Sequence, residues 1–135
     1  IRAIRIGGRD DVTASHIVWE QTNGVPVLAS PLYVAPHLYT ITRDNILHCL
    51  QAETGRVVWQ RRLAGAYSAS PVFADGRIYI LSEEGLTLVL RPGPRYDEIA
   101  RNELDATCLA SMAVSQGQFF IRSAEHLYCI GNAGG

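Results

Sequence analysis

The sequence lacks the features that mark several large classes of protein. It contains no apolar stretch near the roughly 20 residues that span a bilayer. Its 12 basic and 13 acidic side chains leave a net charge of −1. Because these charges are interspersed, the chain has no basic footprint of the kind that nucleic acid or an anionic membrane attracts. We therefore expect no transmembrane segment and no nucleic acid partner.

Spacings that hold metals or phosphates are also missing. The three cysteines form no Cys-x-x-Cys pair, and the four histidines (His16, His37, His48 and His126) form no His-x-x-x-His pair. Gly7-Gly8 lacks the further glycines of a phosphate-binding loop. The histidines are expected at the surface or at strand edges. The acidic pairs Asp10-Asp11, Glu83-Glu84 and Asp97-Glu98 are expected at solvated turns and strand ends rather than around calcium.

What the sequence does contain is a repeat. Ala29-Ser30, Ala69-Ser70 and Ala110-Ser111 lie 40 and 41 residues apart, and each opens a pair of short apolar segments. A period of roughly 40 to 50 residues made of short strands is typical of the blades of a β-propeller. The three serines recur with the blade, which a nucleophile would not do, so we expect them to pack near a central channel.

A second element recurs out of phase with the first. Ile17–Glu20, which contains Trp19, returns as Val57–Gln60, which contains Trp59, and a degenerate third copy is Glu98–Arg101 with Ile99 aligned on Trp59. Ahead of Trp59 the chain turns on Thr54-Gly55, where glycine adopts a positive φ without steric cost. This pattern predicts a hairpin that ends in a large aromatic residue.

The strand pattern predicts an all-β fold with about four antiparallel strands in each unit. The expected strands are Val27–Val34, His37–Thr42, Ile46–Gln51 and Arg56–Leu63 in one unit, and Tyr67–Ala74, Arg77–Ser82, Leu86–Arg91 and Tyr96–Glu103 in the next. Turns are expected at Asp75-Gly76 and Glu83–Gly85. Several strands are continuous apolar runs, which indicates sheets covered on both faces. A helix over Asp97–Leu109 competes on propensity, and the repeat register argues against it.

The segment Ala52–Trp59 resembles the tryptophan docking motif of quinoprotein-type β-propellers, the repeat named after pyrroloquinoline quinone (PQQ). With the Ala-Ser-Pro and Gly-Arg-Ile-Tyr segments, the resemblance covers nearly the whole chain. It implies that Trp19, Thr54, Gly55 and Trp59 are structural docking residues, the rings packing between blades and the Thr-Gly turn fixing the outer hairpin. It also implies a periplasmic or cell-envelope location. Gln51 and Arg56 stand where the family usually has Asp and Lys, and the turn Pro92-Gly93-Pro94 lacks the motif.

The length predicts an incomplete ring, since propellers have about four to eight blades. We expect one domain over 1–135 with about three and a half blades: the outer strands of a truncated blade in 1–23, blades in 24–64 and 65–105, and a last blade in 106–135 that lacks its outer strand. Leu127, Cys129 and Ile130 would then lie on an unpaired edge. Open edges and blade faces of this kind predict that the isolated chain self-associates.

The cysteines are interpreted as buried free thiols that act as small hydrophobic residues. Cys49 and Cys129 fall at equivalent positions of different blades. Cys108 and Cys129 are expected about 9 to 10 Å apart from the usual strand spacing, which exceeds the reach of a disulfide. We expect no catalytic, cofactor-binding or metal-binding residues in this segment.

Two functions follow from the resemblance. One is a non-catalytic PQQ-like propeller that serves as a scaffold for a protein, polymer or other ligand in the bacterial cell envelope. The alternative is a fragment of a PQQ-dependent dehydrogenase, which would use the quinone and calcium, a disulfide of adjacent cysteines and an aspartate base. The sequence has no adjacent cysteines and no evident set of calcium ligands beside a base, and this favours the scaffold.

Overall fold

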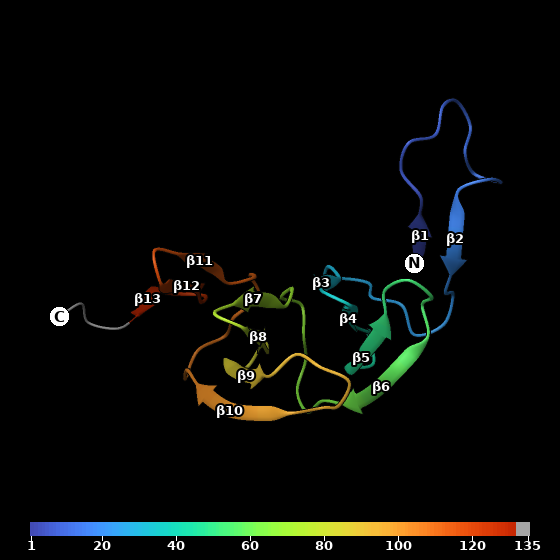
Figure 1. Cartoon of the computed structure of the whole chain (residues 1–135). Helices are drawn as coiled ribbons and strands as arrows, with labels where there is room; N and C mark the ends of the chain where they lie inside the picture. Colours follow the sequence, from blue (N-terminus) through green and yellow to red (C-terminus); the bar gives the residue numbers. More distant parts are fainter. Residues whose placement is uncertain (132–135) are drawn as a thin grey trace.

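The computed structural model, which describes residues 1–131, consists of short antiparallel strands arranged in four consecutive sheets (Figure 1). A two-stranded sheet of β1 (Arg2–Ile4) and β2 (Ile17–Glu20) comes first. Two four-stranded sheets follow, made of β3 (Leu32–Val34), β4 (His37–Ile41), β5 (Ile46–Gln51) and β6 (Val57–Arg62), and of β7 (Val72–Ala74), β8 (Arg77–Leu81), β9 (Leu86–Leu90) and β10 (Glu98–Glu103). The last sheet contains β11 (Ala113–Ser115), β12 (Gln118–Arg122) and β13 (Leu127–Gly131).

Each sheet is a simple meander, because its strands pair in the order in which they occur in the sequence. In Figure 1 the first strands β3, β7 and β11 lie near one another, while β6 and β10 lie along the far side of their sheets. This arrangement confirms the prediction of an all-β propeller with antiparallel four-stranded blades and an incomplete ring. The residues 97–109 contain strand β10 and no helix, as the repeat register predicted.

Two-residue turns join the first and second strands of the later blades. Asp75 and Gly76 have φ values of 45° and 71°, and Gln116 and Gly117 have values of 50° and 75°. Positive φ at both central residues matches the twist of the flanking strands, and glycine adopts it readily. The predicted hairpin at Asp75-Gly76 is therefore present.

The inner strands are shorter than predicted. Strand β3 begins at Leu32 rather than Val27, and β7 begins at Val72 rather than Tyr67. Pro31 and Pro71 precede these strands and have no N–H to give to a ladder. The amides of Ser30 and Ser70, one residue earlier, bond to the next blade and not to their own sheet. Residues 27–31 and 67–71 are therefore linkers that run between blades.

The hydrophobic core is divided into two clusters, one between the two four-stranded sheets and one between the second of these and the β11–β13 sheet. Ile78 and Ile80 of β8 face the cluster shared with the β3–β6 sheet, whereas Tyr79 and Leu81 belong to the cluster shared with the β11–β13 sheet. Successive residues of one strand thus enter different cores. This arrangement explains why the strand is apolar at every position instead of alternating.

Strand β13 forms the edge of the last sheet, since among the described residues it pairs only with β12. Its side chains Leu127 and Ile130 are 70% and 44% exposed, and Cys129 is also exposed. The expected unpaired edge is present in residues 1–131. We refer to the far side of the β11–β13 sheet, where Arg122 and Leu109 lie, as the open face.

Candidate functional site

The ring of Trp59 docks the β3–β6 blade onto the turn between β9 and β10 of the next blade. Its Nε1–H donates a hydrogen bond of 3.0 Å to the carbonyl oxygen of Gly93, and the Gly93 N–H donates one of 2.9 Å to the hydroxyl of Tyr39. The Trp59 ring lies 5.9 Å from the ring of Tyr39 and 5.6 Å, edge to face, from that of Tyr96. Burial raises the pKa of the Tyr39 hydroxyl to about 12, so it stays protonated at neutral pH. The turn at Gly93 is therefore held at both its N–H and its carbonyl.

Trp19 uses the same position one blade earlier. Its Nε1–H donates a 2.9 Å hydrogen bond to the carbonyl oxygen of Ala52, and its ring covers Gly55, where an added Cβ would come within 2.7 Å of ring carbons. Gly55 also has a φ of 71°. Thr54 and Gly55 thus lie in the turn that receives Trp19 of the preceding sheet, and not beside Trp59 of their own hairpin. How much these residues contribute to stability stays a prediction.

At the third junction the docking ring is absent. The alignment of Ile99 on Trp59 is wrong by one residue: Trp59 pairs with Cys49, and the equivalent pair in the next blade is Ala100 with Val89. Both blades have a register shift at this place, which leaves Val58 unpaired in β6 and Ile99 unpaired in β10, so Ala100 takes the place of Trp59. The rings of Tyr79 and Phe119, with centroids 4.4 Å apart, fill part of this junction.

The repeated serines connect consecutive blades at their inner ends. The Ser70 hydroxyl accepts a 2.9 Å hydrogen bond from the N–H of Ser30, and the Ser111 hydroxyl accepts one of 2.9 Å from the N–H of Ser70. Ser70 and Ser111 each satisfy the amide of the serine one blade earlier, which lies outside its own sheet. Sequence reasoning placed these residues at packing positions, but the blade-to-blade hydrogen bond required the structure.

Apolar side chains recur on the exposed inner surface. Tyr33, Phe73 and Val114 occupy the middle of β3, β7 and β11, and they are 61%, 43% and 40% exposed. Phe73 and Val114 are exposed although a blade precedes each of them in the structure. Leu28 and Leu109, at equivalent positions of the linkers, are exposed as well. We call these five residues the inner apolar surface.

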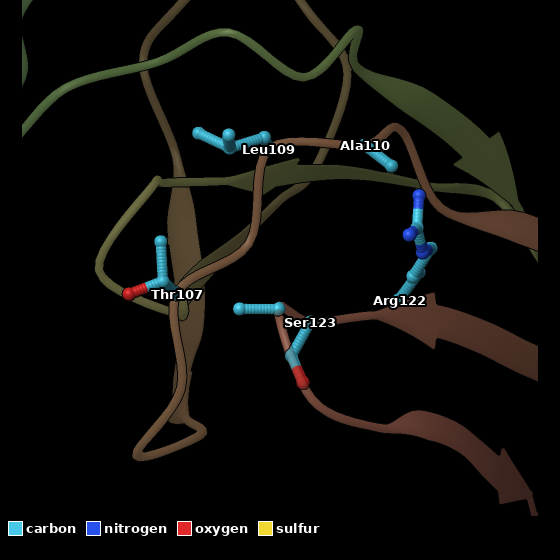
Figure 2. Close-up of a pocket in the computed structure, with 6 residues that line it drawn as sticks. Thr107, Leu109, Ala110, Arg122 and Ser123 are labelled. Carbon is cyan, nitrogen blue, oxygen red and sulfur yellow. The ribbon is translucent and has the colours of Figure 1, made fainter.

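A cavity of about 310 Å³ opens beside the inner apolar surface, on the open face of the last sheet (Figure 2). Its lining comes from the linker before β11 and from the end of β12, and includes Thr107, Leu109, Ala110, Arg122, Ser123 and Ala124. In Figure 2 the Arg122 side chain extends toward Ala110. The cavity therefore combines an apolar wall with one guanidinium group.

The histidines and cysteines follow the sequence interpretation only in part. His48 is buried and not at a surface, because its ring faces the link after β2, where Gly24 lies against it. His48 Nε2 lies 3.2 Å from Oε1 of Gln60.

Cys49 and Cys108 are buried free thiols as predicted, and burial raises the pKa of Cys49 to about 11. Cys129 is exposed, which corrects its assignment as buried.

The acidic pairs are engaged at turns and strand ends. Asp11 accepts a bond from the Thr13 N–H, Asp97 pairs with Arg91 at 2.6 Å, and Glu83 accepts a bond from the Ser68 hydroxyl. The hydrogen bond and charge of Arg101 lower the pKa of Glu98.

Within residues 1–131 no three His, Cys, Asp or Glu side chains gather as metal ligands would. The same part of the chain has no helix long and apolar enough to cross a membrane.

Known proteins with similar sequences or structures point to one repeat family. The family described as outer membrane protein assembly factor BamB matches residues 11–91, which is more than half of the chain. No curated protein matches. Among solved structures, BamB from Moraxella catarrhalis has a TM-score of 0.70 at 18% identity, covering 85% of this chain and 36% of that protein.

Quinoprotein enzymes share the fold as well. Quinohemoprotein alcohol dehydrogenase ADHIIG from Pseudomonas putida HK5 gives a TM-score of 0.59 at 15% identity, over 76% of this chain and 17% of the enzyme. The corresponding enzyme from Comamonas testosteroni gives 0.57 at 16% identity, over 73% and 17%. The chain thus spans about a third of the length of the BamB structure and less of the enzymes.

Proposed function

We infer the function from one premise: this chain belongs to the BamB family of PQQ-like repeat β-propellers. We propose that it is a non-catalytic scaffold that binds a protein in the bacterial cell envelope. The envelope location is carried over from the name of the family, outer membrane protein assembly factor. Protein binding rests in addition on a feature of this chain.

That feature is the inner apolar surface. Phe73 and Val114 remain 43% and 40% exposed beside neighbouring blades, and Tyr33 stands at the equivalent position. Exposed apolar residues that gather on one surface are typical of protein interaction sites, where aromatic side chains supply much of the affinity. They recur at one position of each blade, in the middle of the neighbouring first strands β3, β7 and β11.

Site-specific photo-crosslinking tests this proposal. A photoreactive amino acid replaces Phe73 or Val114 in cells that express the protein, and the crosslinked products are identified in the envelope fraction. The matched control is Ile99, which is 39% exposed on the outer strand β10. We expect a defined protein adduct from positions 73 and 114 and little from position 99. Equal labelling at all three positions, or none at the inner ones, would contradict the proposal.

The dehydrogenase alternative would be favoured if this segment bound the quinone. We propose that residues 1–135 alone bind neither PQQ nor calcium. Titration with both, described below, tests this proposal without relying on a partner protein.

A further inference from the structure

Arg122 lies on the open face. Its position in the repeat is taken by buried apolar residues at the junctions between the β3–β6, β7–β10 and β11–β13 sheets. It ends β12, as Ile41 ends β4 and Leu81 ends β8. In each case a hydroxyl residue follows and accepts an amide hydrogen bond across the turn: Thr42 from Ile46, Ser82 from Leu86 and Ser123 from His126. The three positions are thus equivalent, yet Ile41 and Leu81 are 2% and 0% exposed and apolar.

The internal junctions show what covers this position. Ile41 shares a core cluster with Tyr67, and Leu81 shares the other cluster with Cys108. Tyr67 and Cys108 lie 41 residues apart, each in the linker that leads into the inner strand of the next blade. Side chains of the following blade therefore cover both positions, and its linker contributes Tyr67 to one cluster and Cys108 to the other.

The cavity at Arg122 repeats a cavity between the two complete blades. That cavity, of about 130 Å³, is lined on one side by Leu28, Ile41, Thr42 and Arg43, and on the other side by Ala66, Tyr67 and Glu83 of the next blade. Leu109, Arg122, Ser123 and Ala124 reproduce the first side at the open face, where the cavity grows to about 310 Å³. The larger volume corresponds to the side that the next blade covers elsewhere.

We propose that the open face docks a further blade of the same repeat, and that the linker of this blade presents an Asp or Glu carboxylate to Arg122. A guanidinium group buried without a counter-charge strongly destabilises an interface, and its planar fork of N–H donors matches a carboxylate. In the internal cavity the Glu83 carboxylate accepts a hydrogen bond from Ser68 of its own blade, and Tyr67 and Cys108 carry no charge. The docked blade therefore differs from both internal ones at the residue that faces Arg122. This inference concerns blade packing and does not depend on the proposed protein partner.

A chain extended by one repeat tests the ion pair. Because Phe120 pairs with Cys129 as Tyr79 pairs with Val89, Gly131 corresponds to Arg91. A second copy of residues 92–131 is therefore fused after Gly131, which brings the added copy of Cys108 to Arg122. Four proteins are compared: each has either Arg122 or R122L, and either Cys108 or C108E in the added copy. Urea unfolding gives the folding equilibrium constant of each.

We expect C108E in the added copy to raise the folding constant at least about tenfold more with Arg122 than with R122L, within the range of coupling between contacting charges. An equal or smaller effect with Arg122 would overturn the proposal.

A display experiment covers the case in which the designed variants fold poorly. The added position 108 is randomised, the library is exposed to protease on the surface of yeast, and intact proteins are sequenced. We expect enrichment of Asp and Glu with Arg122 and of apolar residues with R122L. Enrichment of apolar residues in both libraries, or equal recovery of all residues, would overturn the proposal.

Discussion

Replacing Trp59 by alanine should reveal how strongly one blade is fastened to the next. The substitution removes the ring that packs on Tyr39 and Tyr96 and the Nε1–H that donates to the Gly93 carbonyl. Large aromatic residues in such positions cost about 3 to 5 kcal/mol when truncated to alanine. A hydrogen bond of this kind accounts for about 1 kcal/mol of that loss. We therefore expect Trp59→Ala to lower the free energy of unfolding by about 3 to 5 kcal/mol.

Urea unfolding followed by circular dichroism measures this change, with two controls that divide it. Trp59→Phe keeps an aromatic ring but loses the Nε1–H and part of the indole volume, so it should cost more than the about 1 kcal/mol of the hydrogen bond and less than Trp59→Ala. Val58→Ala alters the neighbouring, 39% exposed residue of the same strand and should cost less than about 0.5 kcal/mol. This contrast separates docking of the ring from the general effect of a substitution in β6.

A loss below about 1 kcal/mol for Trp59→Ala would refute the reasoning, because it would fall outside the range for a packed aromatic residue. The same would hold if Trp59→Phe cost as much as Trp59→Ala, since the ring would then contribute nothing. The first outcome would mean that the core cluster around Ile78 and Leu90 holds the junction without the tryptophan. The second would mean that groups which phenylalanine lacks account for the whole loss.

Four further predictions address other parts of the molecule. Gly55→Ala should destabilise the protein by more than about 1 kcal/mol, since the alanine would need a positive φ and its Cβ would lie 2.7 Å from the ring of Trp19. Tryptophan fluorescence during urea unfolding measures the loss of stability, and an unchanged unfolding midpoint would contradict the prediction. A thiol reagent at pH 8 should label Cys129 alone, and rapid labelling of all three thiols in the folded state would be inconsistent with the burial of Cys49 and Cys108. The free energy of unfolding should fall as pH rises from the ordinary thiol pKa of 9.0 through about 11, because the Cys49 thiol stays protonated in the folded state while it ionises in the unfolded chain. The purified 135-residue chain should self-associate through the open face and the β13 edge, which sedimentation velocity tests, and a stable monomer at micromolar concentration would count against it. Titration with PQQ and calcium should leave the absorbance of the quinone unchanged, whereas tight one-to-one binding would favour the dehydrogenase alternative.

The architecture could be read from the sequence because it follows from local pattern and period. The 40- and 41-residue spacing of Ser30, Ser70 and Ser111 indicated equivalent units, and apolar runs such as Ile78–Leu81 indicated sheets covered on both faces. Hairpin turns follow from residues that tolerate positive φ, as at Asp75-Gly76. All of these signals depend on neighbours along the chain, so no knowledge of the packed blades was required.

The contacts of the docking residues could be predicted only in part. The motif indicated that Trp19 and Trp59 pack between blades, but it did not show that each ring bonds to a carbonyl of the following blade, at Ala52 and Gly93. Those partners lie 33 and 34 residues away, and only the stacking of sheets brings them together. The bulges beside Trp59 in β6 and beside Ala100 in β10 also required the structure, because a bulge is defined by the pairing with the neighbouring strand.

The sequence by itself determined the repeat, the order of the strands and the positions of the docking rings, since these are set by spacing and residue type along the chain. Only the tertiary structure decided which side chains are covered. Cys49 and Cys129 occupy the same position of the repeat, yet one is buried and the other exposed. Arg122 lies at the open face, where Ile41 and Leu81 enter a core. Burial in a propeller depends on the adjacent blade, so identical places in the repeat acquire different environments.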